Sequence, residues 1–129
     1  MATISLLVMS APAASQNTQS ALRFAQTVAQ SEHQLNGVFF YADGVHNGNH
    51  LQVNPADEQS VYAGWAQLAS QHDCPLLVCV TAASKRGVLS QTDAQDNDLN
   101  QFNLQAPFQA VGLGELAELF HNSDRVIQF

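Results

Sequence analysis

The chain has 129 residues, the usual size of one domain, and its 46% hydrophobic and 12% charged residues are typical of a globular protein. Four Lys and Arg residues against 11 Asp and Glu residues give a formal charge of −7, which argues against a nucleic-acid-binding surface and against attraction to acidic membranes. We therefore expect one domain over residues 1–129, with no direct nucleic-acid or membrane partner.

Apolar stretches and cysteines indicate a cytoplasmic protein. The longest apolar stretch, residues 75–83, is far shorter than the ~20 residues of a transmembrane helix. Residues 1–9 lack the basic region and cleavage site of a signal peptide and are predicted to form a strand. Cys74 and Cys79 on one extended strand would have Cα atoms about 16 Å apart, too far for a disulfide. Two free thiols are typical of a reducing compartment.

Apolar runs alternate with amphipathic segments, which predicts parallel strands covered by helices. A first strand over residues 4–9 is followed by a small-residue loop containing Pro12, where a central strand cannot continue. Helical spacing of apolar residues predicts a helix over residues 18–31. Residues 35–41 form the second predicted strand, and glycines and asparagines predict a loop over residues 42–53.

A second helix is predicted to start at Asn54 and to run to about residue 71. Asn54 can cap a helix, and Pro55 suits its first position. Asp57 and Glu58 favour the positive end of the helix.

The third strand is predicted over residues 75–80, followed by a short helix over residues 81–86 that ends at Gly87. Ser90-Gln-Thr-Asp93 matches a capping box and opens a polar, acidic segment through about residue 103. The remaining predicted elements are a strand over residues 108–111, a helix over residues 113–120 and a strand over residues 125–129.

Five strands with intervening helices predict a flavodoxin-like three-layer α/β/α domain with a mainly parallel sheet. Reactive groups in such folds gather at the C-terminal ends of the strands. That edge should contain residues 10–17, residues 41–46 and residues 79–84.

Cys79 is the strongest candidate for chemistry. It is the penultimate residue of the buried strand predicted over residues 75–80 and immediately precedes a helix, whose free N-terminal amides stabilise a thiolate. Lys85 and Arg86 lie in the last turn of that helix, and their long side chains can lean back toward the sulfur. Thr81 and Ser84 add hydroxyl donors. The alternative is an inert core cysteine, because free cysteines are often buried.

Other candidate residues are less distinctive. Cys74 lies at the opposite end of the strand, which favours an inert core residue. Tyr41 either lines a pocket around Cys79 or is simply a half-buried strand end. His46 and His50 are four residues apart, but they lie in a predicted loop without a third ligand, so a solvated loop is favoured over a metal site.

The segment from residue 79 to residue 88 resembles the active-site segment of the TusD/DsrE family of sulfur-relay proteins, in which a cysteine is followed by small residues, two basic residues and a glycine. Thr81 and Ser84 stand where small apolar residues are expected, and residues 10–17 do not closely match the family's first loop. Further similarities lie in residues 31–33, residues 38–45 with Asn47, Trp65 with Leu68, residues 112–114 and residues 124–129.

This resemblance implies that Cys79 accepts sulfane sulfur as a persulfide from an upstream carrier and hands it to an acceptor cysteine, without a metal, flavin or nucleotide. In the TusD branch the relay ends in 2-thiouridine at the tRNA wobble position, and in the DsrE branch it serves dissimilatory sulfur oxidation. The resemblance also implies a hetero-hexamer of three related subunits, with two copies of each.

Two other classes of function remain open from the residues alone. One is a non-catalytic scaffold subunit. The other is a flavodoxin-like flavin-binding module, because the Ser/Thr/Asn-bearing loop over residues 10–20 precedes a helix whose N-terminus could hold a phosphate.

Overall fold

A computed structural model describes all of residues 1–129 and contains one five-stranded sheet. The strands are β1 (Thr3–Val8), β2 (Gln34–Phe40), β3 (Leu76–Cys79), β4 (Phe108–Val111) and β5 (Arg125–Gln128). The helices are α1 (Asn17–Ala29), α2 (Val61–His72), α3 (Val80–Lys85), α4 (Gln91–Asp96), α5 (Leu113–Asn122) and a 3-10 helix, η1 (Ala42–Gly48).

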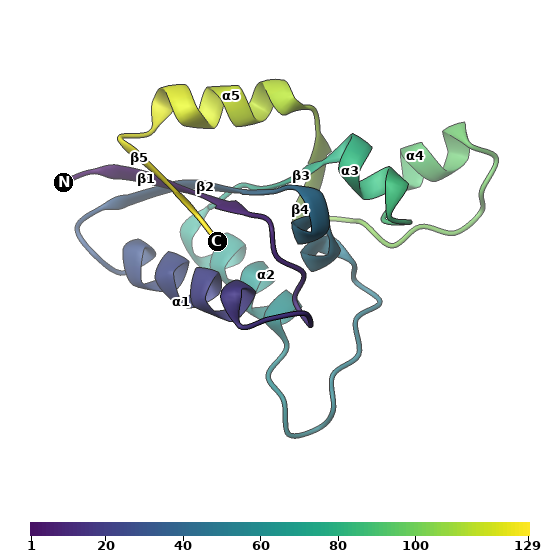
Figure 1. The fold of residues 1–129 in the computed structure, drawn as a ribbon, viewed down its shortest axis with the longest axis horizontal. Coiled ribbons are helices and arrows are strands. Elements are labelled where there is room, and N and C mark those ends of the chain that lie inside the picture. Colours follow the sequence, from purple (N-terminus) through teal and green to yellow (C-terminus); the bar gives the residue numbers. More distant parts are fainter.

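The sheet has the order β4-β3-β2-β1-β5, and every neighbouring pair is parallel. The chain steps in one direction from β1 to β4 and then returns to place β5 beside β1. Because crossovers are right-handed, the forward steps put α1 and α2 on one face and the return step puts α5 on the other (Figure 1). The three-layer α/β/α class is therefore confirmed, although the order differs from the 2-1-3-4-5 order of flavodoxin itself.

The centre of the sheet is apolar on both faces because helices cover both. Phe39 and Phe40 are adjacent in β2 and fully buried, as expected for a strand between two helical layers. Phe40 packs edge-on against Trp65 of α2, with ring centroids 5.2 Å apart, and also contacts Phe108 of β4 at 5.6 Å. These aromatic contacts hold α2 against the middle of the sheet.

The helix start predicted at Asn54 is wrong. The helix α2 begins at Val61, after Ser60, whose hydroxyl accepts a hydrogen bond from the backbone N–H of Ala63 at 3.1 Å. Pro55 lies in a turn instead, where its carbonyl accepts a backbone hydrogen bond from three residues later. Cap-forming residues are present around Asn54, but the apolar face that would hold a helix against the core begins only at Val61.

A buried asparagine ties together the segments at the C-terminal edge of the sheet. Asn47 of η1 is fully buried, and its side-chain amide donates to the carbonyls of Ser10 (3.2 Å) and Gly44 (2.9 Å). Its side-chain oxygen accepts a hydrogen bond from the indole N–H of Trp65 at 3.1 Å. The loop after β1, the η1 turn and the helix α2 are therefore fixed to one another where the sheet ends.

Candidate functional site

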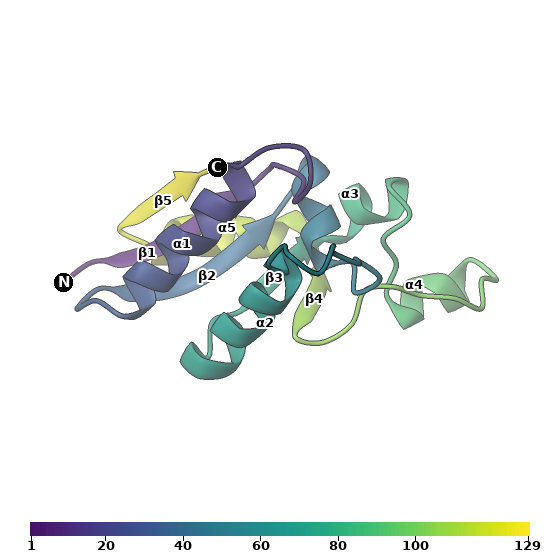
Figure 2. The same ribbon diagram turned by 90° about the horizontal axis from the view of Figure 1, so that it is seen from below.

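Cys79 lies at the junction between the sheet and a helix. It is the last residue of β3, where it pairs with Val111 of β4, and it is also the N-cap residue of α3. Its backbone is extended, and its side chain makes no capping hydrogen bond. The sulfur therefore leaves the sheet at the first turn of α3, although only 3% of the residue is exposed. Figure 2 shows α3 and α4 beyond the C-terminal end of β3.

Tyr41 lies level with Cys79 at the same edge of the sheet. Phe40 of β2 pairs with Val78 of β3, so the register continued by one residue places Tyr41 beside Cys79. Tyr41 is half-buried, and its backbone N–H donates to the carbonyl of Val8 at 3.0 Å. The next residue has a left-handed φ of +50°, which turns the chain sharply from β2 into η1.

The two basic residues after Cys79 have different surroundings. The guanidinium of Arg86 donates to the carboxylate of Asp43 in η1, with Nε to Oδ1 at 2.8 Å, and to the carbonyl of Ala82 at 3.0 Å. This hydrogen bond and the positive charge hold the pKa of Asp43 below its ordinary value, so the ion pair is lost only as the pH falls through that lowered pKa. Lys85 is exposed and forms no salt bridge. The uncompensated cation of α3 is therefore Lys85.

The helix α3 has a buried face and a polar outer face. Ala82 and Ala83 are buried, whereas Thr81 and Ser84 are exposed, as is Lys85. The hydroxyls of Thr81 and Ser84 have no hydrogen-bond partner within the chain, so they are available to a partner molecule at the surface.

A family model described as the DsrE/DsrF-like family matches residues 2–129. The chain belongs to this family. A sulfurtransferase TusD homolog from Vibrio parahaemolyticus is 44% identical over 127 residues, which cover 98% of this chain and 97% of the relative. Sulfurtransferase TusD from Serratia proteamaculans is 45% identical over 124 residues, covering 95% and 96%. At this similarity over nearly the whole length, the protein is a sulfurtransferase.

Solved structures support the same fold. The crystal structure of the ychN protein from E. coli superposes over the full length of both chains, with a TM-score of 0.71 and 19% sequence identity. At that identity the likeness shows the fold alone. No helix has both the length and the apolarity needed to cross a membrane.

The pairing of Asp43 with Arg86 is a feature of this edge that the sequence does not predict. The two are 43 positions apart, so no local spacing could have paired them. No group of three His, Cys, Asp or Glu residues is placed to hold a metal ion.

Cys74 and Cys79 are buried to the same extent, so burial alone does not show which of them is reactive. Cys74 is also a free thiol and is also only 3% exposed. It lies before β3, where burial raises its pKa to about 12, and its thiol points to the carbonyl of Pro75 at 3.7 Å. A thiol that stays protonated at neutral pH is a poor nucleophile, so Cys74 is suited to a place in the core.

Cys74 is expected to make the protein less stable in alkali. The unfolded thiol ionises near 9.0, whereas the folded one does so near 12, so between these values the unfolded state loses a proton that the folded state keeps. The free energy of unfolding should therefore fall by about 1.4 kcal/mol per pH unit in this window. Urea denaturation of Cys74→Ala between pH 8 and pH 11 should show a shallower slope than wild type. Burial also raises the pKa of Tyr62, so some slope should remain, but an unchanged slope would contradict the assignment to Cys74.

Proposed function

We propose that Cys79 accepts sulfane sulfur as a persulfide and passes it to a cysteine of an acceptor protein, in a relay that ends in 2-thiouridine at the tRNA wobble position. The observation that carries this proposal is the position of Cys79, a free thiol at the C-terminal edge of a parallel sheet and at the start of α3. The TusD names of the full-length relatives favour the tRNA branch over dissimilatory sulfur oxidation, which is the alternative end of the relay.

The proposed transfer consists of two exchange steps without net oxidation. The Cys79 thiolate attacks the outer sulfur of the donor persulfide, the donor's S–S bond breaks, and the donor thiolate leaves with the electron pair. A new S–S bond now joins the transferred sulfur to Cys79. The acceptor thiolate then attacks that outer sulfur, and Cys79 leaves as a thiolate. Cys79 therefore takes part as a thiolate in both steps, as the nucleophile in the first and as the leaving group in the second.

Access to Cys79 requires a local opening of the structure. Only 3% of Cys79 is exposed, so a donor persulfide cannot bring its outer sulfur up to the Cys79 sulfur while this edge of the sheet stays covered. The covering segments at this edge are short elements, η1 and α3, and such elements open at lower free-energy cost than the core of a sheet. Partner docking on the polar outer face of α3 is therefore the step that exposes the sulfur.

We also propose that the chain works as a subunit of a cytoplasmic hetero-hexamer with related subunits. The outer surface of α5 supports a subunit interface, because Leu113 and Phe120 lie seven positions apart and are 51% and 50% exposed. Residues seven apart share a helix face. The charge of −7 disfavours assembly of identical copies and favours less acidic partners.

The direct test is the intact mass of the purified protein after incubation with a protein persulfide donor. We expect a gain of one sulfur that a reductant removes, and peptide mapping should place it on Cys79. A gain mapped to Cys74, or none at all, would leave the scaffold role as the better account of this chain.

Asp43→Asn is expected to speed the loading of Cys79 from an anionic donor by about two- to fourfold at low salt, because Arg86 then loses its counter-charge and adds to the field of Lys85. The gain should vanish at high salt. The measurement is the rate of persulfide formation against ionic strength. Asp57→Asn is the matched control, since it removes one exposed acid far along the chain from Arg86. Equal effects of both variants would mean that only the net charge matters.

A further inference from the structure

Two cavities follow the seam between α1 and α2 and form one groove. The larger has a volume of about 1030 Å³ and is bounded by α1 as far as Gln26, by α2 as far as Gln67 and by the loops before the two helices. The smaller has a volume of about 150 Å³. Gln26 and Gln67 line both cavities, so the second continues the first toward the C-terminal ends of the helices. Neither cavity includes a residue of β3 or α3, so the groove is separate from Cys79.

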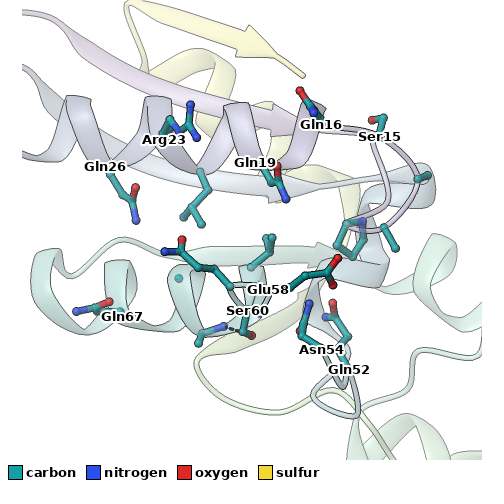
Figure 3. Close-up of a pocket in the computed structure, with 18 of the residues that line it drawn as sticks. Ser15, Gln16, Gln19, Arg23, Gln26, Gln52, Asn54, Glu58, Ser60 and Gln67 are labelled. Carbon is teal, nitrogen blue, oxygen red and sulfur yellow. Dashed lines mark hydrogen bonds between the residues drawn. The ribbon is translucent and has the colours of Figure 1, made fainter. Parts of the chain in front are cut away.

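The walls of the groove are rows of glutamines. Side chains at helical spacing line it from α1 and from α2, and Figure 3 shows Gln19 and Gln26 on one wall opposite Gln67 on the other. Where the helices touch at the floor, Gly64 leaves room for the side chain of Leu22. The lining glutamines are Gln16, Gln19, Gln26, Gln30, Gln52, Gln59, Gln67 and Gln71.

Most of these amides have no partner within the chain. Gln52 is the exception, because its side-chain nitrogen lies 2.8–3.2 Å from the carbonyl oxygens of His46, Asn47 and Asn49, which share its two N–H donors, and so shapes the loop at one end of the groove. The other glutamine side chains make no hydrogen bond within the chain. Each amide offers two N–H donors and one carbonyl acceptor. The groove therefore presents donors and acceptors on both sides.

The charge and composition of the groove define the class of ligand. The larger cavity contains one cation, Arg23, and one anion, Glu58, and neither forms a salt bridge. A phosphate would need more positive charge than this. No aromatic side chain lines the larger cavity, so a nucleobase, a flavin ring or a sugar would find no ring to stack on. A peptide main chain, which is uncharged and alternates N–H with C=O, matches the amides.

The length of the groove fits a short peptide. From Gln16 to Gln30 the α1 wall is about 21 Å long at 1.5 Å per residue. An extended peptide of about six residues, at 3.4 Å per residue, covers that distance. We propose that the α1–α2 groove binds an extended, largely uncharged peptide segment of a partner protein, with its main chain held by the glutamine amides. A partner tethered there leaves Cys79 free, so binding raises the partner's local concentration without blocking the sulfur.

The test is selection of a random dodecapeptide library on the immobilised protein, followed by affinity measurements with the enriched peptides. Gln19→Met combined with Gln67→Met removes two groove amides while keeping side-chain length and helix propensity. Gln91→Met combined with Gln95→Met on α4 is the matched control, because these glutamines are exposed and lie outside the groove. Thermal melts confirm that both double variants fold.

We expect enriched peptides to bind the wild type and the α4 control equally and the groove variant about tenfold more weakly, since two hydrogen-bonding groups are lost. Amide resonances of Gln19, Gln26 and Gln67 should shift when the peptide is added. The proposal is overturned if no peptide is enriched above bare support, or if enriched peptides bind the groove variant as well as the wild type. Binding on the exposed apolar face of α5 would give that second result. This outcome is independent of whether Cys79 carries sulfur.

Discussion

Cys79→Ala is expected to reduce sulfur transfer to the uncatalysed background, because no other thiol of the chain lies at the start of α3. The fold should persist, since removing one sulfur atom from a well-packed site costs about 1 kcal/mol. Transfer is measured as isotopically labelled sulfane sulfur moved from a donor persulfide to an acceptor thiol over time. Thermal melting of the same sample separates loss of chemistry from loss of structure.

Cys74→Ala is the matched control for this result, because it removes a second sulfur that is buried to the same extent, 3% exposed in each case. Its rate of transfer should stay within about twofold of wild type. Cys79→Ser keeps the shape of the side chain and should be as inactive as the alanine variant, since a hydroxyl does not form a persulfide. Transfer by Cys79→Ala at the wild-type rate would exclude the carrier role.

The two central strands β2 and β3 were predictable because their buried residues follow one another without a break, which leaves an uninterrupted apolar run in the sequence. Residues 38–40 and residues 76–79 are such runs, and the structure places both in strands. The capping box at Ser90 was also readable, because its two members are three residues apart, and the Ser90 hydroxyl accepts from the N–H of Asp93 at 3.2 Å. Patterns confined to a few neighbouring residues therefore carried over into the structure.

Features that join distant segments were not predictable in this way. The order of the strands depends on the direction of each crossover, which the spacing of apolar residues does not record. The ion pair of Asp43 with Arg86 joins η1 to α3, and the groove depends on how α1 and α2 pack. At Asn54 a local signal was misleading, because good capping residues precede a segment with no apolar face. Cap chemistry locates a helix only where packing also holds it.

The candidate site contains one feature that the sequence predicted and one that it did not. The position of Cys79 between a strand and a helix followed from the sequence, whereas the outward direction of Thr81 and Ser84 did not. Ala82 and Ala83 form the buried face of the six-residue helix α3, and Thr81 and Ser84 on either side of them face outward. A helix this short contains too few apolar residues for their spacing to predict which face is buried. These hydroxyls therefore lie on the exposed surface of α3.

Gly44→Ala is expected to destabilise the protein by about 2–4 kcal/mol, because the added carbon has no room. A Cβ at Gly44 would overlap the carbonyl oxygen of Val8 and would lie 2.7 Å from the carbonyl carbon of Val8 and 3.2 Å from the Cα of Met9. All of these are backbone atoms at the end of β1, so no side chain can rotate away to make space. Either η1 or the end of β1 must move.

The displacement would reach the edge that contains Cys79. The carbonyl of Gly44 accepts from Asn47, whose side-chain oxygen accepts from Trp65, so moving η1 strains a fully buried polar network. Gly114→Ala is the matched control, because a Cβ there meets nothing within 4 Å and alanine inside α5 should add up to about 1 kcal/mol. Urea denaturation of the two variants should therefore give shifts of opposite sign. If Gly44→Ala were as stable as wild type, η1 could not be packed on β1 as described, and the placement of Asp43 beside Arg86 would lose its support.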